Sequence, residues 1–224
     1  MSTIAIVGAG RGLGLSIAKV FGRNGFDVAL ISLFPDELDE LVLTLKEEGI
    51  TSAGFPADVT DRDQLVMALE AAKERFGRID VLEYSPYAGL DISDPTQLTV
   101  DAARGHIETI LYGAIAAVET VLPEMRASGS GTLLFTTGGG AINPYPFLAS
   151  TNIAQAGLRN WVYNLHQVLA EHGVHVGNVA INVAIGDHHP DDVPHAHPDQ
   201  IAPLYWEHHT TRTAPEALFP AQRA

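Results

Sequence analysis

The chain has 224 residues, of which 46% are hydrophobic and 18% charged, and its formal net charge is −14. This length suits one large folded unit with a substantial core, and the acidic balance argues against a nucleic-acid surface, which needs clustered Lys and Arg. The absence of cysteine from the sequence excludes disulfides, thiolate catalysis and cysteine-type zinc sites. No apolar run approaches the ~20 residues that span a bilayer, and no signal peptide precedes the first strand. We therefore expect a cytoplasmic protein without nucleic-acid or membrane partners.

Short apolar runs alternate with segments of helical periodicity over most of the chain. Strands are predicted at 3–7, 27–32, 51–55, 79–83, 131–136 and 174–183. Helices are predicted at 13–24, 35–48, 61–76, 101–127 and 152–171. This alternation predicts an α/β fold, a single Rossmann-like doubly wound parallel sheet with helices on both faces. Ligands bind such a sheet beyond the carboxyl ends of its strands, where the strand order switches.

The sequence changes character after Gly186. Residues 187–200 read DHHPDDVPHAHPDQ, a composition that predicts a loop without regular structure. A helix is predicted at 201–209, and the tail from residue 213 is expected to be loosely ordered. Imidazole and carboxylate are metal-ligand types, and the loop contains four histidines, His188, His189, His195 and His197. Their spacing matches no zinc pattern and prolines break the loop, so we predict no metal site. The histidines could instead supply a proton near neutral pH.

The stretch VGAGRGLG, residues 7–14, joins the first predicted strand to the first predicted helix. Gly8 permits a tight turn, Gly12 lets a pyrophosphate approach the backbone, and Gly14 lets the helix pack close to the strand. The helix N-terminus adds free N–H groups and a partial positive charge. This order of strand, glycine-rich turn and helix predicts a dinucleotide site that includes Gly10 and Leu13. The alternative is a tight turn kept only for packing.

The type of dinucleotide depends on the end of the second strand. An acidic residue there would bind the ribose hydroxyls of NAD, but this chain has Ser32-Leu33-Phe34. Arg11, inside the glycine loop, could meet the 2′-phosphate of NADP. We therefore predict NADP, with NAD less favoured, and place Ser32 and Leu33 beside the adenosine. The alternative for Arg11 is a solvated loop charge.

Four motifs together resemble the short-chain dehydrogenase/reductase family. They are the spacing Gly8-xxx-Gly12-x-Gly14, ADVTD at 57–61, RIDVLEYSPYAG at 78–89 and VLPEM at 121–125. The resemblance runs from residue 3 to about 186, although Val7 stands where the family usually has Thr. It implies the fold, a nicotinamide cofactor, and cofactor contacts from Asp58, Val59, Tyr84 and Ser85.

The resemblance also implies how the rest of the chain is used. It makes residues 187–212 a substrate-side flap and helix within a single dinucleotide-binding domain, 1–224. The long helices at 101–127 and 152–171 correspond to those that build the family's dimers and tetramers, so a homodimer or homotetramer is expected. Small residues that would let helices pack closely there are Gly113, Ala114, Ala116 and Ala117.

The family's chemistry uses Asn, Ser, Tyr and Lys, and each matching position differs in this chain. The residues found there are Ile110, Gly138 (with Thr137 before it), Thr151 and Gln155. No Tyr-xxx-Lys pair occurs anywhere in the sequence. A threonine hydroxyl is a far weaker acid than a phenol, and glutamine carries no charge that could lower the pKa of a neighbour. Gln155 could still bind a ribose hydroxyl, so cofactor binding can survive where the family's proton transfer does not.

Tyr145, between Pro144 and Pro146, is the preferred substitute acid, with Thr137, Thr151 and Gln155 as further candidates. Its alternative role is packing against the cofactor or a partner chain. Glu83 could be a base, although we expect its carboxylate to pair with backbone N–H groups. Two functions stay open. One is an NADP(H)-binding reductase of a small carbonyl or imine compound with a non-standard proton donor. The other is a non-redox pseudoenzyme, or a cyclase or isomerase, that binds a small molecule in the same cleft.

Overall fold

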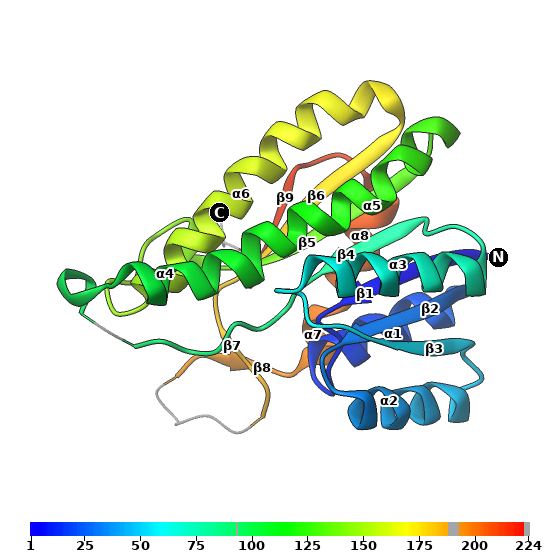
Figure 1. Cartoon of the computed structure of the whole chain (residues 1–224), viewed down its shortest axis with the longest axis horizontal. Helices are drawn as coiled ribbons and strands as arrows, with labels where there is room; N and C mark the ends of the chain where they lie inside the picture. The colour runs from blue at the N-terminus through cyan, green and yellow to red at the C-terminus, as the bar shows by residue number, and fades with distance from the viewer. Residues whose placement is uncertain (93, 188–192, 222–224) are drawn as a thin grey trace.

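A computed structural model describes residues 1–92, 94–187 and 193–221. Its centre is a seven-stranded sheet in the order β3-β2-β1-β4-β5-β6-β9, and every neighbouring pair is parallel (Figure 1). The strands are β1 (Ser2–Val7), β2 (Phe26–Ser32), β3 (Ser52–Pro56), β4 (Val81–Tyr84), β5 (Gly131–Gly138), β6 (Val174–Ile181) and β9 (Glu216–Phe219). The strand order reverses between β1 and β4, so the predicted doubly wound Rossmann-like fold is confirmed.

Helices cover both faces because the central strands carry buried apolar side chains on both sides. One face packs against α1 (Leu13–Arg23), α2 (Pro35–Glu47), α7 (Pro198–Ile201) and α8 (Pro203–Thr211). The other packs against α3 (Arg62–Phe76), α5 (Gly113–Ser128) and α6 (Ala149–Leu169). Each fully buried aliphatic or aromatic side chain contributes about 1.5–3 kcal/mol, and these two cores hold the strand ends that carry the site. No helix among the described residues combines the length and hydropathy that a membrane crossing needs.

The long helix predicted at 101–127 is interrupted. It consists of α4 (Val100–His106), a wider π-helical stretch, η2 (Ile107–Tyr112), and α5. A π-helical stretch changes the backbone hydrogen-bond pattern, and here the carbonyl of Thr109 accepts a 2.5 Å hydrogen bond from the Tyr84 hydroxyl. Ile110, on the same stretch, lines the cleft described below.

The small residues on α5 pack inside the chain. Ala114, Ala116 and Ala117 are buried in the core beneath α5, and a side chain at Gly113 would collide with the Tyr84 hydroxyl. Their size is explained by the approach of α5 to its own sheet, so the packing role between subunits that the sequence suggested for them is wrong. The homodimer or homotetramer stays a prediction.

Two predictions about the C-terminal part are also wrong. The described part of the tail, residues 213–221, is not loosely ordered, because Glu216–Phe219 forms β9 beside β6. Glu216 is held there by Arg159 of α6 at 2.6 Å and by Asn178 of β6 at 2.9 Å. A four-residue strand, Glu-Ala-Leu-Phe, that starts on a partly buried ion pair has an apolar run too short for sequence reasoning to detect.

Residues 187–200, expected to lack regular structure, contain two short elements. β8 (His195–Ala196) pairs with β7 (Ala184–Ile185), and α7 begins after His197, whose ring accepts a 3.1 Å hydrogen bond from the N–H of Asp199. A histidine in the capping position was not an expected helix signal. His188 and His189 lie outside the described residues. Whether the segment acts as a flap stays a prediction.

Candidate functional site

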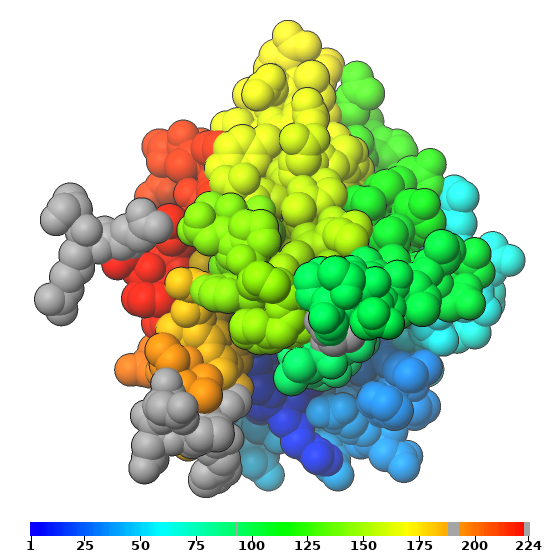
Figure 2. Space-filling model, turned by 90° about the vertical axis from the view of Figure 1, so that its left-hand side faces the viewer, coloured from blue at the N-terminus to red at the C-terminus, as the bar shows by residue number. Residues whose placement is uncertain are grey.

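A cleft of about 950 Å³ lies at the carboxyl ends of β1, β4, β5 and β6. Figure 2 looks at this end of the molecule, with the dark-blue N-terminal segment visible between the orange segment and the paler blue of α2. Among the predicted cofactor residues, the cleft wall includes Gly8, Gly10, Leu13, Tyr84, Ser85 and Gln155. Outside that wall lie Arg11, Gly12, Ser32, Leu33, Asp58 and Val59. The cleft is therefore where an open α/β sheet binds its ligands.

The glycine loop has the geometry of an anion cradle. Gly8 has a φ of +91°, and an added Cβ would lie 2.5 Å from the backbone nitrogen of Pro86. A Cβ on Gly14 would lie 3.0 Å from the Cα of Ala9. α1 begins after Gly12 without a side-chain cap and without an acidic residue in its first turn. Its N-terminal N–H groups and the positive end of its dipole therefore stay available for a phosphate, and the loop fits a dinucleotide pyrophosphate.

Among the helices α1, α2 and α3, α1 is the one that lacks both a side-chain cap and an acidic residue in its first turn. α3 is capped by Asp61, whose carboxylate accepts hydrogen bonds from the N–H groups of Asp63 and Gln64. Those hydrogen bonds lower the pKa of Asp61. α2 carries Asp36 and Glu37 in its first turn. Negative charge of this kind is the usual partner of a helix N-terminus. Near the start of α1, the carboxylate of Asp199 accepts a 2.6 Å hydrogen bond from the Ser16 hydroxyl, and that of Glu37 accepts one from the N–H of Arg11.

Arg11 points along α2. Its guanidinium forms an ion pair with Glu40, which raises the pKa of Arg11, and its backbone N–H donates to Glu37 at 3.2 Å. The Arg11 and Glu40 side chains are 64% and 59% exposed, so solvent screens their pairing and it contributes little to stability. Ser32 is buried at the end of β2 and Leu33 is 52% exposed. The guanidinium is near the predicted adenosine end but already has a carboxylate partner.

The predicted adenine contacts are fixed by local bonds. The carboxylate of Asp58 accepts hydrogen bonds from the N–H of Thr60 at 2.8 Å and from the Thr60 hydroxyl at 2.7 Å. The carbonyl of Val59 faces Gly113 of α5. Tyr84 borders the cleft, but its hydroxyl is used by Thr109, and burial raises its pKa well above the ordinary value. Tyr84 therefore shapes the cleft and is no acid at neutral pH.

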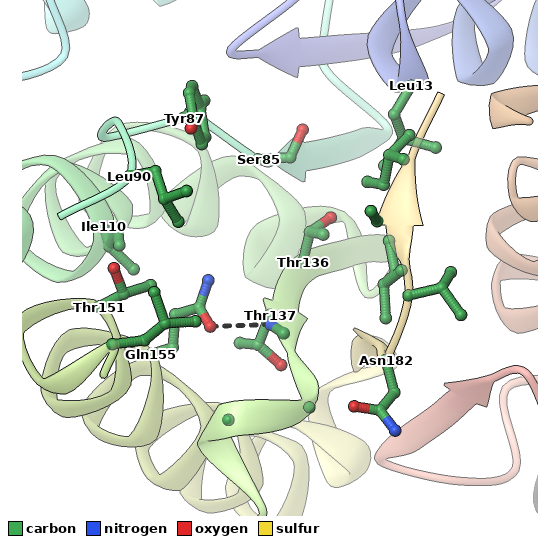
Figure 3. A pocket seen from close by; sticks show the side chains of 18 of the residues that line it. Leu13, Ser85, Tyr87, Leu90, Ile110, Thr136, Thr137, Thr151, Gln155 and Asn182 are labelled. Carbon is green, nitrogen blue, oxygen red and sulfur yellow. Dashed lines mark hydrogen bonds between the residues drawn. The ribbon is translucent and has the colours of Figure 1, made fainter. Parts of the chain in front are cut away.

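Ile110, Gly138, Thr151 and Gln155, which the sequence resemblance assigns to the family's catalytic positions, all line the cleft. The Gln155 Oε1 accepts a 2.8 Å hydrogen bond from the N–H of Gly138 (Figure 3), which leaves its amide N–H₂ free to donate. The Thr151 hydroxyl is buried, with no hydrogen-bond partner among the described residues. Thr137 is buried too and accepts from Asn178 at 2.9 Å. The wall has polar groups for binding but no cation.

Tyr145 also lines the cleft. Its hydroxyl donates a 2.6 Å hydrogen bond to Asn182 Oδ1, and Asn152 donates to its carbonyl at 2.7 Å. Its ring lies 5.9 Å from that of Phe147. Asn152 and Asn182 were missed from the sequence, since no motif marks a lone asparagine at the end of a strand or the start of a helix.

Glu83 does not pair with backbone N–H groups, so that expectation is wrong. Its side chain is fully buried under the cleft floor and accepts 2.9 Å hydrogen bonds from the hydroxyls of Ser85 and Thr136, both of which line the cleft. The Tyr205 hydroxyl of α8 lies 2.5 Å from that of Thr136. Burial raises the pKa of Glu83 to about 8, against the smaller opposing effect of the two hydroxyls. An acidic residue inside an apolar strand was the one signal the sequence offered.

The described cleft wall contains no Asp, Glu, Lys, Arg or His. Apolar contacts come from Leu90, Ile110, Phe147, Leu148 and Ile185, among others. Within the described residues, no group of three or more His, Asp or Glu side chains is placed to hold a metal ion. Of the histidines after residue 186 that are described, His197 lies 3.7 Å from Asp187 and 3.5 Å from Asp199.

Comparisons with known proteins agree with this geometry. The sequence model for short chain dehydrogenases matches residues 2–186. The oxidoreductase BOA17 of Botryotinia fuckeliana is 30% identical over 174 residues, which cover 76% of this chain and 61% of that protein. The chain spans between half and two thirds of the length of curated relatives such as this one.

Two solved structures show the same fold at low sequence identity. A metagenomic short-chain oxidoreductase in complex with NADP has a TM-score of 0.85 and 21% identity, covering 99% of this chain and 98% of that one. A short-chain oxidoreductase from Pseudomonas aeruginosa PAO1, described as containing an atypical catalytic centre, has a TM-score of 0.87 and 16% identity, covering 100% and 98%.

Proposed function

Because the chain belongs to the short-chain dehydrogenase family, we propose that it is an oxidoreductase that binds NADP(H) and reduces a small carbonyl or imine compound. The observation that carries the proposal is the glycine loop, whose close packing against Pro86 and uncapped helix N-terminus fit a pyrophosphate. A bound reduced nicotinamide supplies a hydride. The protein's own share is then to hold the substrate, exclude water and provide a proton.

The preference for NADP(H) is supported by Arg11. Its partner Glu40 is exposed, so the ion pair is weak and a 2′-phosphate, with its larger charge, competes for the guanidinium. The acidic residue that would bind the ribose hydroxyls of NAD at the end of β2 is absent, since Ser32 and Leu33 stand there. The solved relative with NADP is consistent with this choice.

The substrate class follows from the cleft wall. With no charged side chain among the described lining residues, a substrate carboxylate or ammonium would lose its water without gaining an ion pair, which is costly. Apolar and aromatic groups such as Leu90, Ile110 and Phe147 favour an uncharged, largely apolar compound. The Gln155 amide N–H₂ can donate to its oxygen, and the Tyr145 hydroxyl can do so when it turns from Asn182.

Tyr145 is the candidate proton donor taken from the sequence. Its phenol faces the cleft, and Asn182 orients it through a 2.6 Å hydrogen bond. A general acid contributes typically 10²–10⁴-fold to the rate. If Tyr145 is the donor, Tyr145→Phe should lower kcat by at least 100-fold with little change in cofactor affinity. A variant that keeps the wild-type kcat removes Tyr145 from this role.

A non-redox function is the second candidate, and the loss of the family's catalytic side chains favours it. Thr151 and Gln155 stand where the family has Tyr and Lys. The side-chain carbonyl of Gln155 accepts a hydrogen bond from the backbone N–H of Gly138. A pseudoenzyme, or a cyclase or isomerase, could use the same cleft to bind a small molecule without hydride transfer. This second function would be favoured if NADPH binds but is not oxidised in the presence of any compound from a broad panel of uncharged aldehydes, ketones and imines.

We also propose a homodimer or homotetramer. Exposed apolar side chains lie on the helices that the family resemblance assigns to subunit contacts, among them Val100 (74% exposed), Tyr112 (59%) and Ile153 (49%). Burying such groups in a second copy is favourable. Light scattering coupled to size exclusion should give two or four times the chain mass of 23.9 kDa. A mass of one chain at micromolar concentration contradicts the proposal.

A further inference from the structure

Glu83 is a carboxyl group that the proposed function has not used. It lies in β4 between buried apolar neighbours, with no exposed surface, and forms no ion pair within the described part of the chain. Its two hydrogen-bond partners, Ser85 and Thr136, are partly exposed and face the cleft. Glu83 therefore reaches the cleft only through two hydroxyl groups.

The hydrogen bonds around Glu83 can be counted. Three join four side chains: Ser85 to Glu83 Oε2, Thr136 to Glu83 Oε1, and Thr136 to Tyr205. If Glu83 is ionised, the three hydroxyls supply three protons, and all three are used within the network. Ser85 and Thr136 then offer only oxygen lone pairs to the cleft.

A neutral Glu83 changes this count. It adds a fourth proton to a network with three bonds, so one proton is surplus. Tyr205 is fully buried and has no outlet to the cleft. The surplus proton therefore emerges on Ser85 or Thr136 as an O–H that points at a ligand. The floor of the cleft can donate a proton only while Glu83 is neutral.

We propose that Glu83 is the proton store of this cleft, and that it delivers a proton to the substrate through the hydroxyl of Thr136 or Ser85. The inference rests on the proposed reductase function. Glu83 is a positioning residue, since it acts through those hydroxyls. It supplies what the chain lacks where the family has Tyr and Lys: a protonated acid group at neutral pH that is connected to the cleft through two hydroxyl groups that line it.

The electrostatic surroundings support a neutral Glu83. The ionisable group that faces it is Tyr205, whose own pKa is raised by burial and by Glu83. Ser85 and Thr136 are uncharged, and no described Lys, Arg or His pairs with it. Burial raises the pKa of Glu83 to about 8, so the stored proton is present at neutral pH and is lost above pH 8.

The reaction balances with this proton. A bound reduced nicotinamide would supply the hydride for the new C–H bond at the carbonyl carbon, and the C=O π electrons would move to oxygen. That oxygen takes the hydroxyl proton of Thr136 or Ser85, forming the product O–H bond. The hydroxyl takes the proton of Glu83, which is left as a carboxylate and is protonated again from water in the open cleft.

The test compares the pH dependence of kcat in the wild type and in Glu83→Gln. Glutamine has the volume of glutamate and keeps a carbonyl and an amide for the two hydroxyls, but it stores no titratable proton. Asp80→Asn is the matched control, because Asp80 is a carboxyl just before the other end of β4 that binds the N–H of Thr3 at 2.9 Å. The wild type and Asp80→Asn should lose activity tenfold per pH unit above pH 8. Glu83→Gln should be about 100-fold slower at pH 7 and should lack this decline.

The two hydroxyl groups that would pass the proton to the substrate, those of Thr136 and Ser85, are tested separately. Thr136→Val and Ser85→Ala each remove one hydroxyl, and the double variant should fall to the rate of Glu83→Gln. A Glu83→Gln variant with the wild-type rate and pH profile overturns the proposal, even if Tyr145→Phe is inactive.

A measurement without turnover separates this inference from the proposed function. Carbon-13 NMR of labelled glutamate should show one carboxyl titrating near pH 8 in the wild type and in Asp80→Asn, and missing from Glu83→Gln. If that signal titrates below pH 6, the proton store is refuted whether or not the protein reduces a carbonyl. If the signal titrates near pH 8 but neither NADPH nor NADH binds, the reductase function fails, and the proton-delivery proposal fails with it.

Discussion

Replacing Glu83 by glutamine should make the protein more stable at alkaline pH. In the folded chain Glu83 is neutral up to about pH 8, whereas the unfolded chain ionises it near 4.5. Unfolding between these pH values therefore releases a proton, and rising pH favours the unfolded state. The free energy of unfolding should fall by about 1.4 kcal/mol per pH unit from this group, and by about 5 kcal/mol in total.

Urea denaturation of the wild type and Glu83→Gln at pH 5 and pH 8 measures this contribution. Other groups titrate in the same window, so the quantity to follow is the difference between the two proteins at each pH. That difference should move in favour of Glu83→Gln by a few kcal/mol between pH 5 and pH 8. A difference for Glu83→Gln that does not change with pH would refute the argument that Glu83 is neutral when folded.

Three further changes test other parts of the account. Gly8→Ala should lower NADPH affinity at least tenfold, because its Cβ would meet the backbone of Pro86. The control is Gly25→Ala, which has a similar φ of +87° but no atom within 4 Å of the added Cβ, and should bind NADPH normally. Equal affinities of the two variants in a fluorescence titration would contradict the role of the glycine loop as an anion cradle. Arg11→Ala should weaken NADPH binding about 10–100-fold and leave NADH binding nearly unchanged; an equal effect on both cofactors excludes contact with the 2′-phosphate. Burial lowers the pKa of His175 to about 3, so unfolding takes up a proton below pH 6.5, and this residue alone should lower stability by up to about 1.4 kcal/mol per pH unit on acidification. In urea denaturation at pH 7 and pH 5, a His175→Gln variant should lose less stability than the wild type, and an equal loss would contradict a buried neutral ring.

The fold could be predicted from the sequence because its elements repeat strong local signals. The apolar run before the glycine loop forms β1, and the helices predicted at 35–48 and 61–76 are α2 (Pro35–Glu47) and α3 (Arg62–Phe76), followed by Gly49 and Gly77 with positive φ. β9 and β8 could not be predicted this way. Each is short, and each is held by distant partners such as Arg159 or β7, which periodicity does not reveal.

The sequence predicted those site residues that belong to short motifs of neighbouring residues. Gly8, Leu13, Ser85 and Gln155 were placed at the cleft from motif positions, and they line it. The Glu83 network could not be predicted, because Tyr205 reaches Thr136 across 69 residues of sequence. The partner of Arg11 was missed for the same reason: Glu40 lies 29 residues away, and only the packing of α2 beside the glycine loop brings it close.

The central claim is that this cleft binds a nicotinamide dinucleotide. Titration of the wild type with NADPH and NADH, followed by nicotinamide fluorescence, tests it most directly. We predict saturable binding with NADPH preferred over NADH, and loss of that binding in Gly8→Ala but not in Gly25→Ala. Absence of binding to either cofactor at millimolar concentration would contradict the claim.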